Sequence, residues 1–61
     1  MSMNEAQKAY IESAKSWNAV DFSIETGQNL EHCRECYEML ELEEWQAYCQ
    51  QWAKKILGLS E

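Results

Sequence analysis

The chain has 61 residues, enough for one small domain that buries about 60% of its unfolded surface. Eleven acidic and five basic residues give a net charge of −6, which disfavours direct binding to nucleic-acid phosphates or to an anionic membrane surface. No apolar run reaches the roughly 18 residues of a membrane span, and the first residues lack the basic and apolar parts of a signal peptide, so we expect a single domain over residues 1–61 in the cytoplasm.

The first predicted helix runs from about residue 4 to about residue 25. Ser2 and Glu5 have the S-x-x-E spacing of a capping box, which satisfies free backbone N–H groups at a helix start. Apolar residues then recur every seven positions, at Met3, Tyr10, Trp17 and Ile24. Gly27 favours an end to this helix, although poor helix formers such as Asn18 also allow an end near Val20.

The second predicted helix covers about residues 30–40. Asn29 is a good N-cap, and apolar residues step by 3, 4 and 3 through Leu30, Cys33, Tyr37 and Leu40. The next apolar residue, Leu42, follows after only two positions, which does not fit one continuous helical face. The sequence therefore leaves two alternatives: a bend near residues 39–41, or one long helix with two offset faces.

The third predicted helix covers about residues 42–57 and carries the longest apolar pattern of the chain. We call this pattern the ladder; it steps by 3, 4, 3, 4 and 3 through Leu42, Trp45, Cys49, Trp52, Ile56 and Leu59. Gly58 can cap the end of the helix. With no proline and two glycines in the whole chain, these patterns predict an all-α fold.

The ladder presents more aromatic and aliphatic surface than such a short chain is expected to cover. Small scaffolds often need a staple or a second copy to form a sufficient core. We therefore expect a hairpin of two or three helices that pairs with a second copy into a homodimeric bundle. Its core and dimer contacts would be the ladder residues together with Trp17 and Tyr10.

Acidic residues are concentrated in the middle of the chain. Between residues 21 and 44 there are eight acids and one base, Arg34, which leaves a charge of −7 on that segment. This can be a solvated face or a docking surface for a basic protein. The expected partner-binding residues are Glu31, Glu35, Glu38, Glu41, Glu44, Tyr48 and Phe22, the last two adding apolar contacts.

The function that these features favour is non-enzymatic protein binding. In size and charge the chain resembles the short phage-borne inhibitors and antirepressors that act on transcription regulators, although no motif matches a particular family. The acidic segment favours a basic partner, such as a DNA-binding regulator or a nuclease. A plain assembly subunit is an alternative. No enzyme is expected, because the chain has neither a glycine-rich phosphate loop nor an H-E-x-x-H motif.

One motif, His32-Cys33-x-x-Cys36, could carry chemistry of its own. Cys33 and Cys36 lie one helical turn apart and could share a zinc ion, with His32 as a further donor, so a zinc-stapled adaptor module is a second alternative. A second C-x-x-C pair is missing, and a redox role lacks the βαβ context of such motifs. The expectation is that Cys33 and Cys49 are small buried apolar residues and that no cofactor is bound.

Overall fold

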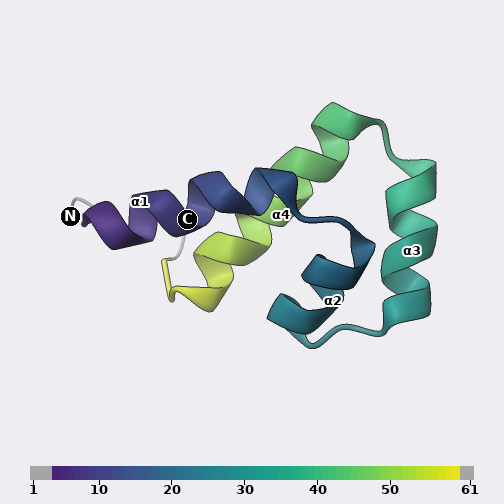
Figure 1. Cartoon of the computed structure of the whole chain (residues 1–61), viewed down its shortest axis with the longest axis horizontal. Coiled ribbons are helices and arrows are strands. Elements are labelled where there is room, and N and C mark those ends of the chain that lie inside the picture. The colour runs from purple at the N-terminus through teal and green to yellow at the C-terminus, as the bar shows by residue number, and fades with distance from the viewer. Residues whose placement is uncertain (1–3, 60–61) are drawn as a thin grey trace.

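The structure is a computed structural model that describes residues 4–59. The all-α prediction is confirmed, since every regular element within these residues is helical. Four α-helices and one turn of 3₁₀-helix follow one another (Figure 1): α1 (Glu5–Ser13), η1 (Ala14–Ser16), α2 (Ala19–Thr26), α3 (Leu30–Met39) and α4 (Leu42–Ile56). Across the described residues, no helix has the length and apolar character needed to cross a membrane.

α1 begins two residues later than the predicted capping box implies, with Asn4 in place of Ser2 as the N-cap. Asn4 is the N-cap: its side-chain oxygen accepts a hydrogen bond from the Gln7 backbone N–H at 2.8 Å, and the Gln7 side chain accepts from the Asn4 N–H at 3.1 Å. Ser2 and Met3, which figured in the prediction, lie outside the described residues. The helix start is therefore set by an N-x-x-Q box instead of S-x-x-E.

The prediction of one continuous helix over residues 4–25 is wrong, because the helix is interrupted at Trp17. Trp17 is extended, with φ −65° and ψ 134°, and Asn18 starts α2 as its N-cap. The Asn18 side chain accepts from the Asp21 N–H at 2.8 Å, while the Asp21 carboxylate accepts from the Asn18 N–H at 3.4 Å. These short polar side chains satisfy a new helix start better than they fit a helix interior.

The two later helices lie close to the ranges expected from the sequence. Gly27 ends α2 in the left-handed conformation, with φ 74°, and the Asn29 side chain accepts from the His32 N–H at 3.0 Å to start α3. Leu40 is extended, so α3 and α4 are separate helices, and the bend is the alternative that the structure adopts. After α4, Gly58 has φ 79° and donates its N–H to Lys55, while Leu59 donates to Lys54, as in a Schellman motif.

The core lies where α1, η1 and α2 pack against α4. Its centre is Trp45, which is 1% exposed and donates its indole N–H to the Trp17 backbone oxygen at 2.8 Å. Phe22 of α2 lies beside it, with 5.2 Å between the two ring centroids. The buried residues of this core are Ile11, Ala14, Ala19, Phe22, Cys33, Trp45, Cys49 and Ala53.

The buried side of α4 is rotated away from the predicted ladder. Trp45, Cys49 and Ala53, spaced by four, form the buried stripe, whereas Leu42 and Ile56 are 64% and 42% exposed. Trp52 and Leu59 are partly buried against the core, as are Tyr10 and Trp17. Lys55 covers part of the Trp52 ring, with its ammonium nitrogen 4.9 Å from the ring centroid.

One chain is enough to bury Trp45, while pairing with a second copy stays a prediction. Ala14 and Ala19 allow close approach of the N-terminal helices to α4, and the Phe22 ring fills the space between them. No second copy is needed for that burial, and the structure does not show a dimer.

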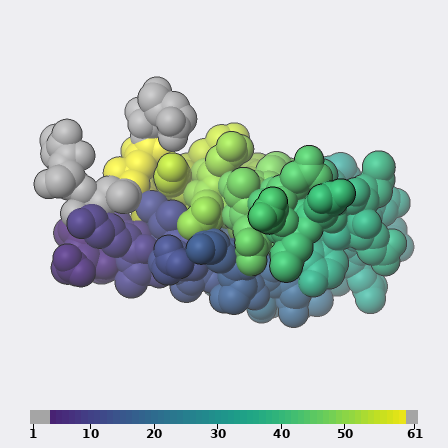
Figure 2. Space-filling model, turned by 90° about the horizontal axis from the view of Figure 1, so that it is seen from above, coloured from purple at the N-terminus to yellow at the C-terminus, as the bar shows by residue number. Residues whose placement is uncertain are grey.

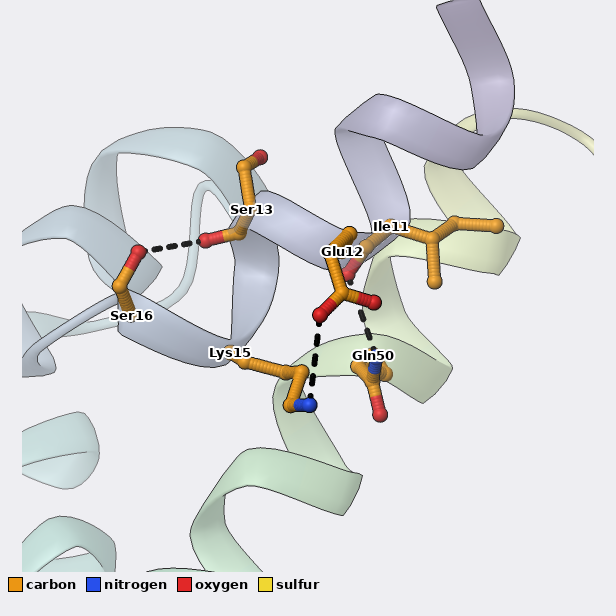
Figure 3. A network of polar contacts seen from close by, with 6 residues as sticks. All are labelled: Ile11, Glu12, Ser13, Lys15, Ser16 and Gln50. Carbon is orange, nitrogen blue, oxygen red and sulfur yellow. Dashed lines mark hydrogen bonds and ion pairs between the residues drawn. The ribbon is translucent and has the colours of Figure 1, made fainter. Parts of the chain in front are cut away.

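A polar contact links α1 to α4 beside the core (Figure 3). The Gln50 side chain of α4 donates to the Ile11 backbone oxygen at 3.4 Å, while Lys15 and Glu12 form an ion pair at 3.3 Å on the neighbouring surface. α3 lies farther out. It packs mainly on α2 and forms one end of the molecule, away from the start of α1 and the end of α4 (Figures 1 and 2).

Candidate functional site

The exposed side of α3 carries an uncompensated row of acids. Glu31, Glu35 and Glu38 are all exposed and follow the i, i+4, i+7 spacing of one helical side. Among residues 4–59, the Lys15–Glu12 contact is the one ion pair within 4 Å, so none of these three carboxylates is paired there. We call Glu31, Glu35 and Glu38 the acidic row.

Glu41 and Glu44 have a local structural role at the start of α4. The Glu44 carboxylate accepts a hydrogen bond from the Glu41 backbone N–H at 3.1 Å. Acidic groups at a helix N-terminus are also favoured by the helix dipole. Both side chains are exposed, but their position is explained by helix capping without any partner.

The two aromatic residues predicted to bind a partner, Phe22 and Tyr48, lie away from the acidic row. Phe22 is 1% exposed, so in this fold it belongs to the core and not to a partner-binding surface. Tyr48 is half-buried and stacks on Phe22, with 5.3 Å between centroids and 16° between ring planes. Neither residue lies on α3 beside the acidic row.

Exposed apolar residues on α2 and α3 were not predicted as site residues. Val20, Ile24, Leu30 and Tyr37 are all exposed, with Ile24 at 72%. Tyr37 contacts the edge of Trp45 at a centroid distance of 5.0 Å, yet much of its ring faces solvent. In the sequence, Ile24 belongs to the period-seven apolar pattern, and Leu30 and Tyr37 belong to the stepped apolar pattern of residues 30–40.

A shallow hollow lies where α2 and α3 meet. Its volume is about 220 Å³, and its lining consists of Asn18, Ala19, Val20, Arg34, Tyr37 and Glu38. Ile24 continues the Val20 side of α2 by one turn, and Leu30 precedes Arg34 by one turn on α3. We call Val20, Ile24, Leu30, Arg34 and Tyr37 the α2–α3 groove. Glu38 belongs to both the acidic row and the lining of the hollow.

The three thiols are divided between core and surface. Cys33 and Cys49 are buried, whereas Cys36 is partly exposed, and all three are free. Burial raises the pKa of the Cys33 thiol, and it raises the pKa of Cys49 to about 11. The Cys36 sulfur lies 3.8 Å from Nε2 of His32, which is on the preceding turn of α3.

This division does not support the predicted zinc alternative. Cys33 is fully buried, Cys36 is partly buried against the same core, and His32 is exposed, so the three predicted donors lie in different environments. Within the described part of the chain, no three His, Cys, Asp or Glu residues are grouped so that they could hold a metal ion. The predicted ligand set is therefore not brought together.

A phenol and a carboxylate link α1 to α2 on the surface. The Tyr10 hydroxyl donates to the Glu25 carboxylate at 2.9 Å. Burial, then this hydrogen bond and the negative charge of Glu25, raise the pKa of Tyr10 to about 12. Tyr10 therefore has a structural role, because its hydroxyl joins α1 to α2.

Taken together, the geometry of residues 4–59 defines a small all-α protein whose α2–α3 groove lies beside carboxylates with no ion-pair partner among those residues. Comparisons of the chain with protein-family models, with curated proteins and with solved structures found no match. The charge and contacts of its own residues are thus the ground for assigning a function.

Proposed function

We propose that this protein is a non-enzymatic binding module that docks on the basic surface of another protein. Its role would be that of an inhibitor or antirepressor-like regulator of a nucleic-acid-binding protein. The observation that carries the proposal is the acidic row of α3, which is exposed and has no ion-pair partner among the described residues.

Two physical arguments support this proposal. Like charges at i, i+4 spacing destabilise a helix by a few tenths of a kcal/mol, so three carboxylates in a row cost the fold a little stability. Opposite charges on a partner would offset that cost, raise the association rate and select basic surfaces over acidic ones. A surface that binds nucleic-acid phosphates has the required Lys and Arg side chains, and the acidic row would compete for them.

The test compares two variants with the same change in net charge. Glu31→Gln/Glu35→Gln alters the acidic row, and Glu5→Gln/Glu12→Gln alters two acids of α1. The tagged wild-type chain first captures its partner from lysate of the source cells, and the affinity of the purified partner is then measured at several salt concentrations.

We expect the α3 variant to bind about tenfold more weakly at low salt, with a shallower salt dependence. The α1 variant should stay within about twofold of wild type. Equal affinities and equal salt slopes for the wild type and the α3 variant would contradict the proposal.

Pairing of two copies is a separate proposal, in which the chain acts as an assembly subunit. It is supported by what remains exposed of the ladder, namely Leu42 and Ile56. Sedimentation of the wild type and of a Leu42→Ser/Ile56→Ser variant tests it. A mass of two chains that falls to one chain in the variant supports pairing through this side of α4, and a one-chain mass for the wild type contradicts it.

A further inference from the structure

The α2–α3 groove combines exposed apolar side chains with Arg34, and nothing covers it within the described residues. Val20 and Tyr37 line its hollow, and the exposed Ile24 and Leu30 lie one helical turn from Val20 and Arg34 on the same sides of α2 and α3. The acidic row lies directly beside it, because each of its members follows a groove residue by one position, or about 100° around α3. An apolar strip with a negative edge therefore runs along α3.

A second copy of this chain is a poor occupant for the groove. In a symmetric pair the same surface is used by both copies, so the acidic row of one copy would lie near that of the other. With a charge of −7 on residues 21–44, this contact would bring like charges together around an apolar centre. The charge pattern instead favours an occupant that is apolar in the middle and basic along one edge.

We propose that the α2–α3 groove binds an amphipathic α-helix whose apolar side enters the groove and whose Lys and Arg residues meet the acidic row. This inference rests on the proposed function and specifies which element of the basic partner is recognised. An amphipathic helix presents apolar residues at i, i+3, i+4 and i+7, the arrangement used when helices dock into grooves.

Arg34 gives the groove a way to select the position of that helix. Its side chain lines the hollow between Val20 and Tyr37, and it has no ion-pair partner within the described part of the chain. A basic residue placed over Arg34 would be repelled, whereas one placed over Glu38 would be attracted. The basic edge of the bound helix therefore lies on the side of the acidic row and not over the hollow.

The test uses two synthetic peptides about four helical turns long with the same composition of Leu and Lys. In the first, leucines follow helical spacing on one side; in the second, they are scattered around the helix. Each is titrated into the full-length ¹⁵N-labelled protein while the backbone amide signals are followed by NMR. The variant Val20→Ser/Ile24→Ser removes exposed apolar groups of the groove without a charge change, and Leu42→Ser/Ile56→Ser is the matched control on α4.

We expect the amphipathic peptide to shift the amide signals of the groove residues and of the acidic row. The scattered peptide should bind the wild type about tenfold more weakly than the amphipathic peptide does. The amphipathic peptide should also bind the groove variant about tenfold more weakly, while its affinity for the α4 control variant should stay near that for the wild type. Circular dichroism confirms that each variant is folded before it is titrated.

Two other outcomes overturn the inference and differ in what they imply for the proposed function. In the first outcome, both peptides bind the wild type and the groove variant with equal affinity. That affinity falls as salt is added and is lower still for Glu31→Gln/Glu35→Gln, which means that charge alone is recognised. The groove inference is then wrong, while docking on basic surfaces stands. If neither peptide binds at low salt, both the groove inference and the proposed function lose their support.

Discussion

Cys33, Cys36 and Cys49 occupy environments that give them different reactivities. A thiol reacts as its thiolate, so a raised pKa and burial both protect it. Cys33 and Cys49 have both forms of protection, whereas Cys36 is only partly buried and lies beside the exposed His32. The two thiols of the predicted C-x-x-C motif thus differ in burial.

We predict that one thiol of three reacts with Ellman's reagent near pH 8 in the folded protein. In denaturant all three should react, because unfolding removes the burial that protects Cys33 and Cys49. The measurement is the number of thiols released rapidly with and without guanidinium. Rapid reaction of all three in the native protein would contradict the described core.

Tyr10 makes a pH-dependent contribution to stability at alkaline pH. Its pKa is 10.0 in the unfolded chain and about 12 in the folded protein, so the folded state holds the phenolic proton more tightly. The associated stability is fully present below pH 10 and is lost as the pH rises from 10 towards 12.

We therefore predict that the urea midpoint of the wild type falls more steeply with pH in this range than that of Tyr10→Phe. The variant retains the ring but has no proton to lose, and the buried thiols contribute equally to both proteins. A parallel decline of the two midpoints would show that the Tyr10–Glu25 contact does not persist in solution.

Phe22 shows why individual residues of the site were hard to predict. α2 has eight residues, barely two turns, and apolar side chains occur on more than one of its sides: Val20 and Ile24 are exposed, while Ala19 and Phe22 are buried. Over so short a helix, periodicity alone does not identify the buried side. The sequence located the acidic row on a helix, but the groove beside it depends on how α2 meets α3.

At the scale of elements, the helix ends were better specified than the helix interiors. Asn29, Gly27 and Gly58 act at the ends that their residue types indicate. The missed break between η1 and α2 also had a cue in the sequence, since Asn18 and Asp21 have capping-box spacing. It was outweighed by the period-seven pattern, because Trp17 and Ile24 suggested that one helical face continued.

Asn18→Ala should destabilise the protein by about 1 kcal/mol, since it removes the side-chain acceptor that caps α2. Gln28→Ala, in the exposed link between α2 and α3, is the control and should change stability by less than about 0.5 kcal/mol. Urea unfolding followed by circular dichroism measures both. A wild-type midpoint for Asn18→Ala would indicate that the break does not depend on this cap.

For the molecule as a whole, large aromatic side chains supply many of the contacts between the helices of this short chain. Phe22 contacts Trp17, Trp45, Tyr48 and Trp52, so one buried ring joins α2 to both the N-terminal segment and α4. The all-α class was predicted correctly from the helical spacing of the apolar residues. The apparent surplus of aromatic surface also suggested that a second copy was required. Trp45 is nevertheless buried within one chain, where α1, η1 and α2 pack against α4, and pairing of two copies stays a prediction.

If one chain is sufficient for this core, the unfolding transition should not depend on protein concentration. An obligate dimer becomes more stable as its concentration rises, because association and folding are coupled by mass action. We predict the same urea midpoint from about 1 µM to about 100 µM, monitored by tryptophan fluorescence and circular dichroism. Trp45 is 1% exposed within a single chain, so its fluorescence should be blue-shifted even at the lowest concentration. A midpoint that rises with concentration, together with red-shifted emission on dilution, would mean that the aromatic core forms only between two copies.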